Sequence, residues 1–274
     1  MRSPLEARRR LLGRAFVIAL AITALAWTQK GDLPAVGDLR PEMLQEPVQV
    51  DVEAPPFHFE YKGQKVEVQP VADYEMWGLV VSHNNIQSIA DIYHDSSSVD
   101  TKDLCVVWGE SLRNGSYLDV DFWSGPWTCY FRYSAGNPFQ GRDLGNNHMI
   151  TGSAALRDQL ANVRIGDQIR VRGRLVNYRM EDWRDWWRRS STNRDDAGNG
   201  ACEVIYFDQI DTLQAGTPLW YLLFRLGVGL LIVVPLFFVH SLWIDAGRSR
   251  QDLAPETPMP AEMPDVWTGE VESS

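Results

Sequence analysis

The sequence predicts a mainly β domain with one or two helices, flanked by transmembrane helices. Two long apolar runs, one toward each end of the chain, indicate the flanking helices. Between them lie several short segments rich in β-branched and aromatic residues. These are followed by one segment with helical spacing and two in which apolar and polar residues alternate.

The first apolar run, residues 15–27, follows a basic segment, residues 1–14, that holds five arginines and one glutamate. By the positive-inside rule this basic segment stays in the cytoplasm. The run is short for a span, so two interpretations stay open: an uncleaved transmembrane anchor, which we favour, or a signal peptide that is removed. Both interpretations export the residues that follow.

The next two parts differ in composition. Residues 28–56 are rich in proline and acidic residues and show little periodicity, which is typical of an extended tether. Residues 57–217 number about 160, the size of one ordinary domain with its own core.

The second apolar run, residues 218–243, is the longest in the chain. At a rise of about 1.5 Å per residue, a helix of this length covers a bilayer core of about 30 Å. The acidic, proline-rich tail, residues 244–274, contains too little apolar surface to fold alone. We therefore expect this tail to be disordered in the cytoplasm and residues 57–217 to lie on the other side of the membrane.

The clearest strand is "DQIRVRGRLVNY", residues 167–178. Ile169, Val171 and Leu175 fall on one face and the arginines between them on the other, as in a half-buried strand. Before it, "SAALRDQLANV" has helical spacing, with Ser153 as the expected N-cap. After it, "CEVIYFDQIDTL" alternates again.

Several strands, then a helix, then two strands is the order of an OB-fold-like five-stranded barrel, in which the helix lies between the third and fourth strands. A β-sandwich is the alternative. Barrels of this type often bind oligonucleotides or oligosaccharides. However, the net charge of −10 argues against nucleic acid, because cationic side chains supply most of the nonspecific affinity for phosphates.

The chain has three cysteines, so an oxidising compartment allows one disulfide and leaves one thiol. We expect the pair Cys129–Cys202, which would make Cys202 a staple at the start of the last strand. The alternative pair is Cys105–Cys129.

A sharper hypothesis makes Cys202 or Cys105 a catalytic nucleophile with His148 as its base. Asn146, Asn147 or Asp196 would then orient the histidine. A metal site is not expected: His83 and His94 lack the short spacing of ligand pairs, and with Asp91, Asp95 and His148 they form no recognisable pattern. No cofactor is predicted.

The segment from Arg179 to Arg194 mixes basic and aromatic residues and is the best candidate for a binding surface. If it were a helix, Trp183 and Trp187 would share a face. The expected partners are membrane lipid and a protein, either a different chain or a second copy. The expected binding residues are Trp183, Trp186, Trp187, Arg184, Arg188 and Arg189.

Six segments taken together resemble an uncharacterised family of proteobacterial membrane-anchored proteins: "DIYHD", "DLCVVWG", "WTCYFRY", "NNHMI", "GDQIRVRGRLVNY" and "RSSTNRDDAGNGACE". The likeness covers about residues 60–212. The family often has threonines around the aspartate of the last element, whereas here Asp195 and Ala197 flank Asp196. The resemblance implies a bacterial inner-membrane protein with a periplasmic domain, and it implies no particular activity.

The leading hypothesis is therefore a noncatalytic binding module, anchored in the inner membrane and exposed to the periplasm. The first alternative is a periplasmic Cys/His hydrolase, and the second is an oligonucleotide-binding barrel. A disulfide at Cys202 would favour the binding module. A free Cys202 beside His148 in a cleft would favour the hydrolase.

Overall fold

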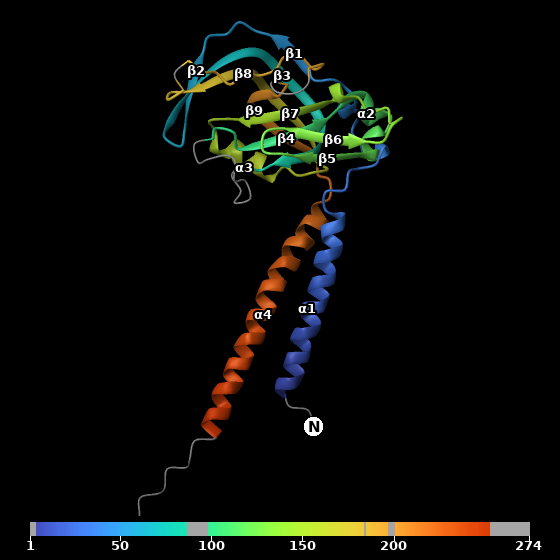
Figure 1. Ribbon diagram of the computed structural model, residues 1–274, viewed down its shortest axis with the longest axis vertical. Coiled ribbons are helices and arrows are strands. Elements are labelled where there is room, and N and C mark those ends of the chain that lie inside the picture. The colour runs from blue at the N-terminus through green and yellow to red at the C-terminus, as the bar shows by residue number, and fades with distance from the viewer. Residues whose placement is uncertain (1–3, 87–97, 184, 197–200, 253–274) are drawn as a thin grey trace, which may run out of the picture. The chain divides into compact units, whose positions relative to one another are not determined.

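The computed structural model describes residues 4–86, 98–183, 185–196 and 201–252 (Figure 1). The chain divides into two compact units, Met1–Ile22 with Leu226–Ser274, and Thr23–Arg225. Residues 244–252 of the tail that we expected to be disordered are helical, and residues 253–274 lie outside the described residues.

Within the described part of the chain, two helices are long and apolar enough to cross a membrane: α1 (Pro4–Gln29) and α4 (Pro218–Asp252). The candidate spans within them are Glu6–Gln29, with 24 residues, and Pro218–Ile244, with 27 residues. The helix α1 starts inside the arginine-rich segment and is therefore longer than the apolar run at 15–27. Two apolar helices flanking a mainly β region confirm the coarse prediction.

The main sheet is mixed and has seven strands among the described residues. Five of them surround the core: β3 (Gln64–Asn84), β4 (Lys102–Val107), β7 (Leu144–Ile150), β8 (Gln168–Met180) and β9 (Glu203–Gln214). The strand β3 pairs with both β4 and β8, β4 pairs with β7, β7 runs parallel to β9, and β9 pairs with β8. The pairings therefore lead from β3 around to β3 again.

The remaining elements attach to this sheet. The short strands β1 (Val48–Asp51) and β2 (Phe57–Tyr61) pair with β3, and β5 (Val120–Ser124) and β6 (Cys129–Tyr133) form a separate two-stranded sheet. The helices are α2 (Gly109–Arg113) and α3 (Ala154–Asn162), with 3-10 turns at Val36–Asp38, Pro41–Leu44, Ser116–Asp119 and Gly141–Asp143.

The strand and the helix that the sequence predicts are confirmed as β8 and α3. Ile169, Val171 and Leu175 on β8 are fully buried. The hydroxyl oxygen of Ser153 accepts a hydrogen bond from the backbone N–H of Leu156 at 3.4 Å, so Ser153 caps α3 as expected. The helix α3 lies between β7 and β8 in the chain.

Part of the expected tether, residues 28–56, is packed on the domain, which corrects that expectation. Met43 is fully buried in the core, and β1 pairs with β3. The backbone N–H of Arg40 donates to Gln168 Oε1 at 2.7 Å, and Tyr117 Oη donates to the Pro34 carbonyl. A buried methionine and a strand pairing hold this segment in place, although its proline content is typical of a linker.

Candidate functional site

The site is built from the register of β4 against β7. In that pairing Asp103 is opposite His148, and Cys105 is opposite Asn146. Successive side chains of a strand point to opposite faces of the sheet, so residues two positions apart share a face. Asp103, Cys105, Asn146 and His148 thus lie on one face of two neighbouring strands.

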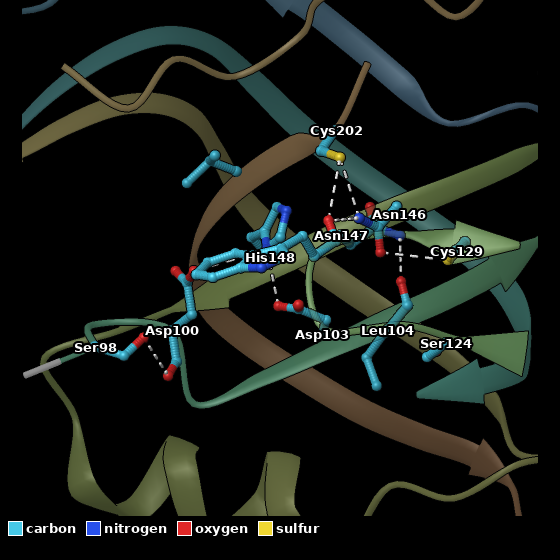
Figure 2. A network of polar contacts seen from close by, with 12 residues as sticks. Ser98, Asp100, Asp103, Leu104, Ser124, Cys129, Asn146, Asn147, His148 and Cys202 are labelled. Atoms are coloured by element: carbon cyan, nitrogen blue, oxygen red, sulfur yellow. Dashed lines mark hydrogen bonds and ion pairs between the residues drawn. The ribbon is translucent and has the colours of Figure 1, made fainter. Parts of the chain in front are cut away.

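The strand β9 adds the cysteine. It runs parallel to β7 with Asn147 opposite Glu203, which places Cys202 beside Asn146. The Asn146 side-chain Nδ2 donates to Cys202 Sγ at 3.1 Å, as Figure 2 shows. The backbone N–H of Ser191 donates to the Cys202 carbonyl at 2.9 Å and fixes the backbone there.

His148 is completely buried and is held on both sides of its ring. Its Nδ1 lies 2.9 Å from Asp103 Oδ1 and 3.7 Å from Asp100 Oδ2 (Figure 2). Its Nε2 lies 2.7 Å from Nη2 of Arg188. Arg188 is positioned by two backbone hydrogen bonds with Tyr178, each 2.9 Å long, at the end of β8.

The protonation of His148 is set by opposing effects. Burial lowers its pKa, but the charge and hydrogen bond of Asp103, the hydrogen bond with Cys202 and the charge of Asp100 together raise it to about 10. The Arg188 contact works against protonation, because a guanidinium can only donate and so requires a lone pair on Nε2. With either the guanidinium or the imidazolium in place, a positive group faces Cys202.

Cys202 is the free cysteine of the chain and is partly exposed. Burial raises the pKa of its thiol, but the hydrogen bond and charge of His148, the hydrogen bond from Asn146 and the charge of Arg188 outweigh burial and lower that pKa. The thiolate is the nucleophilic form of cysteine, so this environment favours reactivity.

A cleft of about 1040 Å³ opens beside Cys202. Four of the expected binding residues line it together with Cys202 and Asn146: Trp186, Trp187, Arg188 and Arg189. On the other side it is lined by residues of β6 and the turn before it, among them Trp127, Tyr130 and Phe131. The expected binding loop and Cys202 of the Cys/His hypothesis thus line one cleft, whereas His148 is fully buried and does not line it.

The loop itself differs from a helix. Its described residues form turns and an isolated bridge. Trp183 packs on Tyr178 and Trp186, with ring centroids 5.5 and 4.6 Å apart, and belongs to the core side of the loop. Trp187 lies under the Arg179 guanidinium, so Trp183 and Trp187 share no helical face. Arg184 lies outside the described residues.

The disulfide corrects the preferred pairing. Cys105 and Cys129 are bonded, with Cα atoms 5.9 Å apart, and Cys202 is free. The bond joins β4 to β6, two strands that belong to different sheets, and closes a separation of 24 residues rather than the longer loop expected for Cys129–Cys202. It contributes about 3 kcal/mol in the chain-entropy model.

Among the described residues, one buried group could hold a metal ion. Ligand atoms of Asp100, Asp103 and His148 lie within 4.8 Å of one another. In the structure Asp103 and His148 are hydrogen-bonded to each other, which accounts for their proximity. His83 is elsewhere on β3, where burial lowers its pKa to about 4, and Asp91, His94 and Asp95 lie outside the described residues.

The sequence did not identify Asp103 or Asp100 as site residues, and it did not predict the contact of Arg188 with His148. It had assigned the orienting role to Asn146, Asn147 or Asp196. Instead Asn147 donates to the backbone carbonyls of Leu104 and Gly145, and Asp196 accepts from Ser191 Oγ at 2.6 Å. The alternation of "TKDLCVV" does place Asp103 on the same face as Cys105, and this was the available signal.

Comparisons with protein-family models, with curated proteins and with solved structures gave no match. The family resemblance drawn from the sequence therefore stays a prediction.

Proposed function

We propose that the domain is a thiol-dependent enzyme that cleaves or transfers an acyl group, with Cys202 as nucleophile and His148 as base. The observation that carries this proposal is a free, cleft-lining cysteine whose thiol pKa is lowered by a buried histidine on the neighbouring strand, with Nδ1 of that histidine 2.9 Å from a carboxylate oxygen. A nucleophile, a base and a group that orients the base are the parts that covalent acyl transfer requires.

Each group has a chemical task in this mechanism. Cys202 Sγ attacks the substrate carbonyl carbon, and the thiol proton passes to Nε2 of His148. Asp103 keeps the hydrogen on Nδ1, so that Nε2 carries the lone pair that accepts the proton. The protonated ring then gives its proton to the leaving group, and water hydrolyses the acyl-cysteine to regenerate the thiol.

The negative charge that develops on the carbonyl oxygen needs a donor. Asn146 Nδ2, which already contacts the sulfur at 3.1 Å, is the side chain placed to supply it. Arg188 occupies Nε2 in the structure, so it must leave that nitrogen when the ring accepts a proton. Its charge then stays available to an anionic group in the cleft.

The loop that we expected to bind a partner is the substrate wall in this proposal. Trp186 is 56% exposed and Trp127 is 51% exposed, and both face the cleft with the arginines. Exposed tryptophans beside arginines fit a substrate with an apolar part and an anionic group. In this assignment the loop still binds a partner molecule, and that molecule is the substrate that reacts with Cys202.

We also propose that the domain is an OB-fold-like barrel on the periplasmic side of a bacterial inner membrane, with both ends of the chain in the cytoplasm. The barrel is supported by the cyclic strand pairings, by the parallel pairing of β7 with β9 and by the helix α3 between β7 and β8. The topology is supported by the arginines that precede the first span. The disulfide is supporting evidence for an oxidising compartment.

The enzymatic proposal is tested by thiol kinetics and by turnover of simple acyl probes. In the full-length protein in detergent, we expect iodoacetamide to alkylate Cys202 with a pH midpoint below that of an ordinary thiol. We expect the variant His148→Asn to shift this midpoint upward and to slow alkylation at neutral pH by about tenfold. His58→Asn, at an exposed histidine on β2, is the matched control.

The same proteins are then given p-nitrophenyl esters and thioesters of increasing chain length. Wild type and His58→Asn should hydrolyse at least one class, and Cys202→Ala and His148→Asn should not. Equal thiol reactivity in wild type and His148→Asn at all pH values, together with no turnover of any probe, would overturn the proposal.

A further inference from the structure

The three cysteines of the chain are arranged around one residue, Asn146. Cys105 on β4 and Cys202, which directly precedes β9, are on either side of Asn146, because β7 lies between β4 and β9. Neighbouring strands are about 4.8 Å apart, so Cys105 and Cys202 belong to one row across three strands.

Cys129 comes from β6 and approaches the same row from the separate sheet. Its Sγ lies 3.3 Å from Asn146 Oδ1, while Cys202 Sγ lies 3.1 Å from Asn146 Nδ2. Figure 2 shows Asn146 between the two sulfur-bearing residues. Cys129 and Cys202 also line the same cleft.

Cys105 occupies a different environment from the other two cysteines. It is 1% exposed, belongs to a core cluster, and its Sγ lies 3.3 Å from the hydroxyl of Ser124. That hydroxyl can donate to the sulfur and so stabilise a thiolate there. Cys129 is therefore the accessible sulfur of the disulfide, and Cys105 is the buried one.

We propose that Cys202 and the Cys105–Cys129 disulfide form an internal thiol–disulfide exchange centre. The Cys202 thiolate attacks Sγ of Cys129, a Cys129–Cys202 bond forms, and the Cys105–Cys129 bond breaks with Cys105 leaving as a thiolate. The proton lost by Cys202 is taken up by the base His148 or by solvent, and Cys105 is protonated in turn. One disulfide and one thiol are present before and after, so the step uses no external oxidant or reductant.

The exchange has a consequence for the cleft. In the exchanged form Cys202 is covalently bonded and has no free thiol, so its reactivity toward any carbonyl compound is lost until the reverse step occurs. The inference goes beyond the proposed acyl transfer, because it requires only that Cys202 attack sulfur.

The first test removes Cys105, the residue that is bonded to Cys129 in the structure. We expect the full-length variant Cys105→Ser, treated in detergent with glutathione disulfide, to form a Cys129–Cys202 bond in most molecules, as mapped by mass spectrometry of non-reduced peptides. The matched control is Cys129→Ser, which leaves Cys105 and Cys202. We expect it to form no Cys105–Cys202 bond and to carry glutathione on Cys202 instead.

The second test uses the unaltered chain and does not depend on the folding of any variant. The protein is equilibrated at pH 6 and at pH 9, quenched with acid, unfolded and alkylated, and the labelled cysteine is identified. We expect Cys105 to carry a share of the label, and we expect exchange after a pH jump to be faster at pH 9, where more of Cys202 is thiolate.

Two results would overturn the inference: separate glutathione adducts on Cys129 and Cys202 in Cys105→Ser with no bond between them, or label on Cys202 alone in the wild type at both pH values. Neither result bears on ester or thioester hydrolysis. Conversely, loss of hydrolysis in His148→Asn with exchange still detectable would separate the two activities.

Discussion

Two regions of the domain combine arginine with carboxylates across paired strands, and they differ in their access to water. On β3 and β8, Arg170 pairs with Glu75 at 2.5 Å and Arg174 pairs with Asp73 at 3.1 Å, with side chains 31% and 26% exposed in the first pair and 47% and 59% in the second. Around His148, the ring and Asp103 are almost completely buried.

The comparison shows that exposure to water determines how strongly a charged residue affects stability and the pKa values of its neighbours. Exposed ion pairs contribute little to stability, because water and salt screen them and two long side chains lose conformational freedom. In the buried group the pKa of His148 is raised to about 10, and the thiol pKa of Cys202 is lowered. The pairs on β3 and β8 are thus partly or largely solvated, whereas burial of the His148 group accompanies shifted pKa values at His148 and Cys202.

The largest effect is expected from Asp103→Asn, which removes the anion beside His148. Breaking a buried pair by removing one partner costs about 3 kcal/mol, and without the Asp103 carboxylate a positive charge on His148 beside Cys202 is less stable. We expect a lower Tm for the detergent-solubilised protein and about tenfold slower iodoacetamide alkylation at pH 7. Unchanged Tm and alkylation would show that the buried group behaves like the exposed pairs.

A smaller effect is expected from Arg188→Gln. Losing the guanidinium removes one positive charge next to Cys202, but it frees Nε2 of His148 to carry a proton and replace that charge. We expect alkylation at pH 7 to slow by about threefold, less than in Asp103→Asn. The neighbouring exposed residue offers the control Arg189→Gln, which should react like the wild type. If Arg188→Gln slows alkylation more than Asp103→Asn, the guanidinium is the main cation beside the sulfur.

Glu203, next to Cys202 in the chain, gives a pH-dependent effect. Burial raises its pKa to about 8 from 4.5, so the folded state binds this proton more tightly than the unfolded state. Stability from this group is therefore complete below pH 4.5 and decreases as pH rises through about 8. The variant Glu203→Gln has no carboxyl group to ionise and so does not lose stability in this way. Its Tm relative to the wild type should therefore increase between about pH 5 and pH 9.

The control for that series is Glu110→Gln, at an exposed residue paired with Arg113. Its Tm should follow the wild type at every pH. A Tm difference between Glu203→Gln and the wild type that stays constant with pH would contradict the assignment of a raised pKa.

The smallest effect is expected on the outer surface. Arg174→Ala removes the exposed pair with Asp73 and should change stability by about 0.5 kcal/mol or less, with the difference vanishing at high salt. Thermal melts at low and high ionic strength measure this. A loss as large as that of Asp103→Asn would remove the distinction between the two regions.

Local sequence patterns were sufficient to predict several structural features. The alternation in residues 167–178 identified the strand β8 and its buried face, and Ser153 identified the start of α3. Cys202 and His148 were recognised as a candidate pair because cysteine and histidine carry this chemistry. Asp103 was overlooked because its distance from His148 depends on the β4–β7 register, which no short segment encodes.

The disulfide illustrates the same limit. Three cysteines allow three pairings, and the sequence offers no distance by which to choose among them. The tertiary structure brings Cys129 of β6 to Cys105 of β4 and leaves Cys202 free. The proline-rich arm was misjudged for a similar reason, since burial of Met43 depends on a partner surface elsewhere in the chain.

By itself, the sequence determined the two apolar helices, the mainly β character of the region between them and the residue types able to react, because these follow from composition and short-range periodicity. Only the tertiary structure decided which cysteine is free, which carboxylate holds His148 and that Arg188 meets them beside one cleft. Those relations join residues 24 to 45 positions apart, and such contacts are created by strand pairing and packing, which local propensity does not specify.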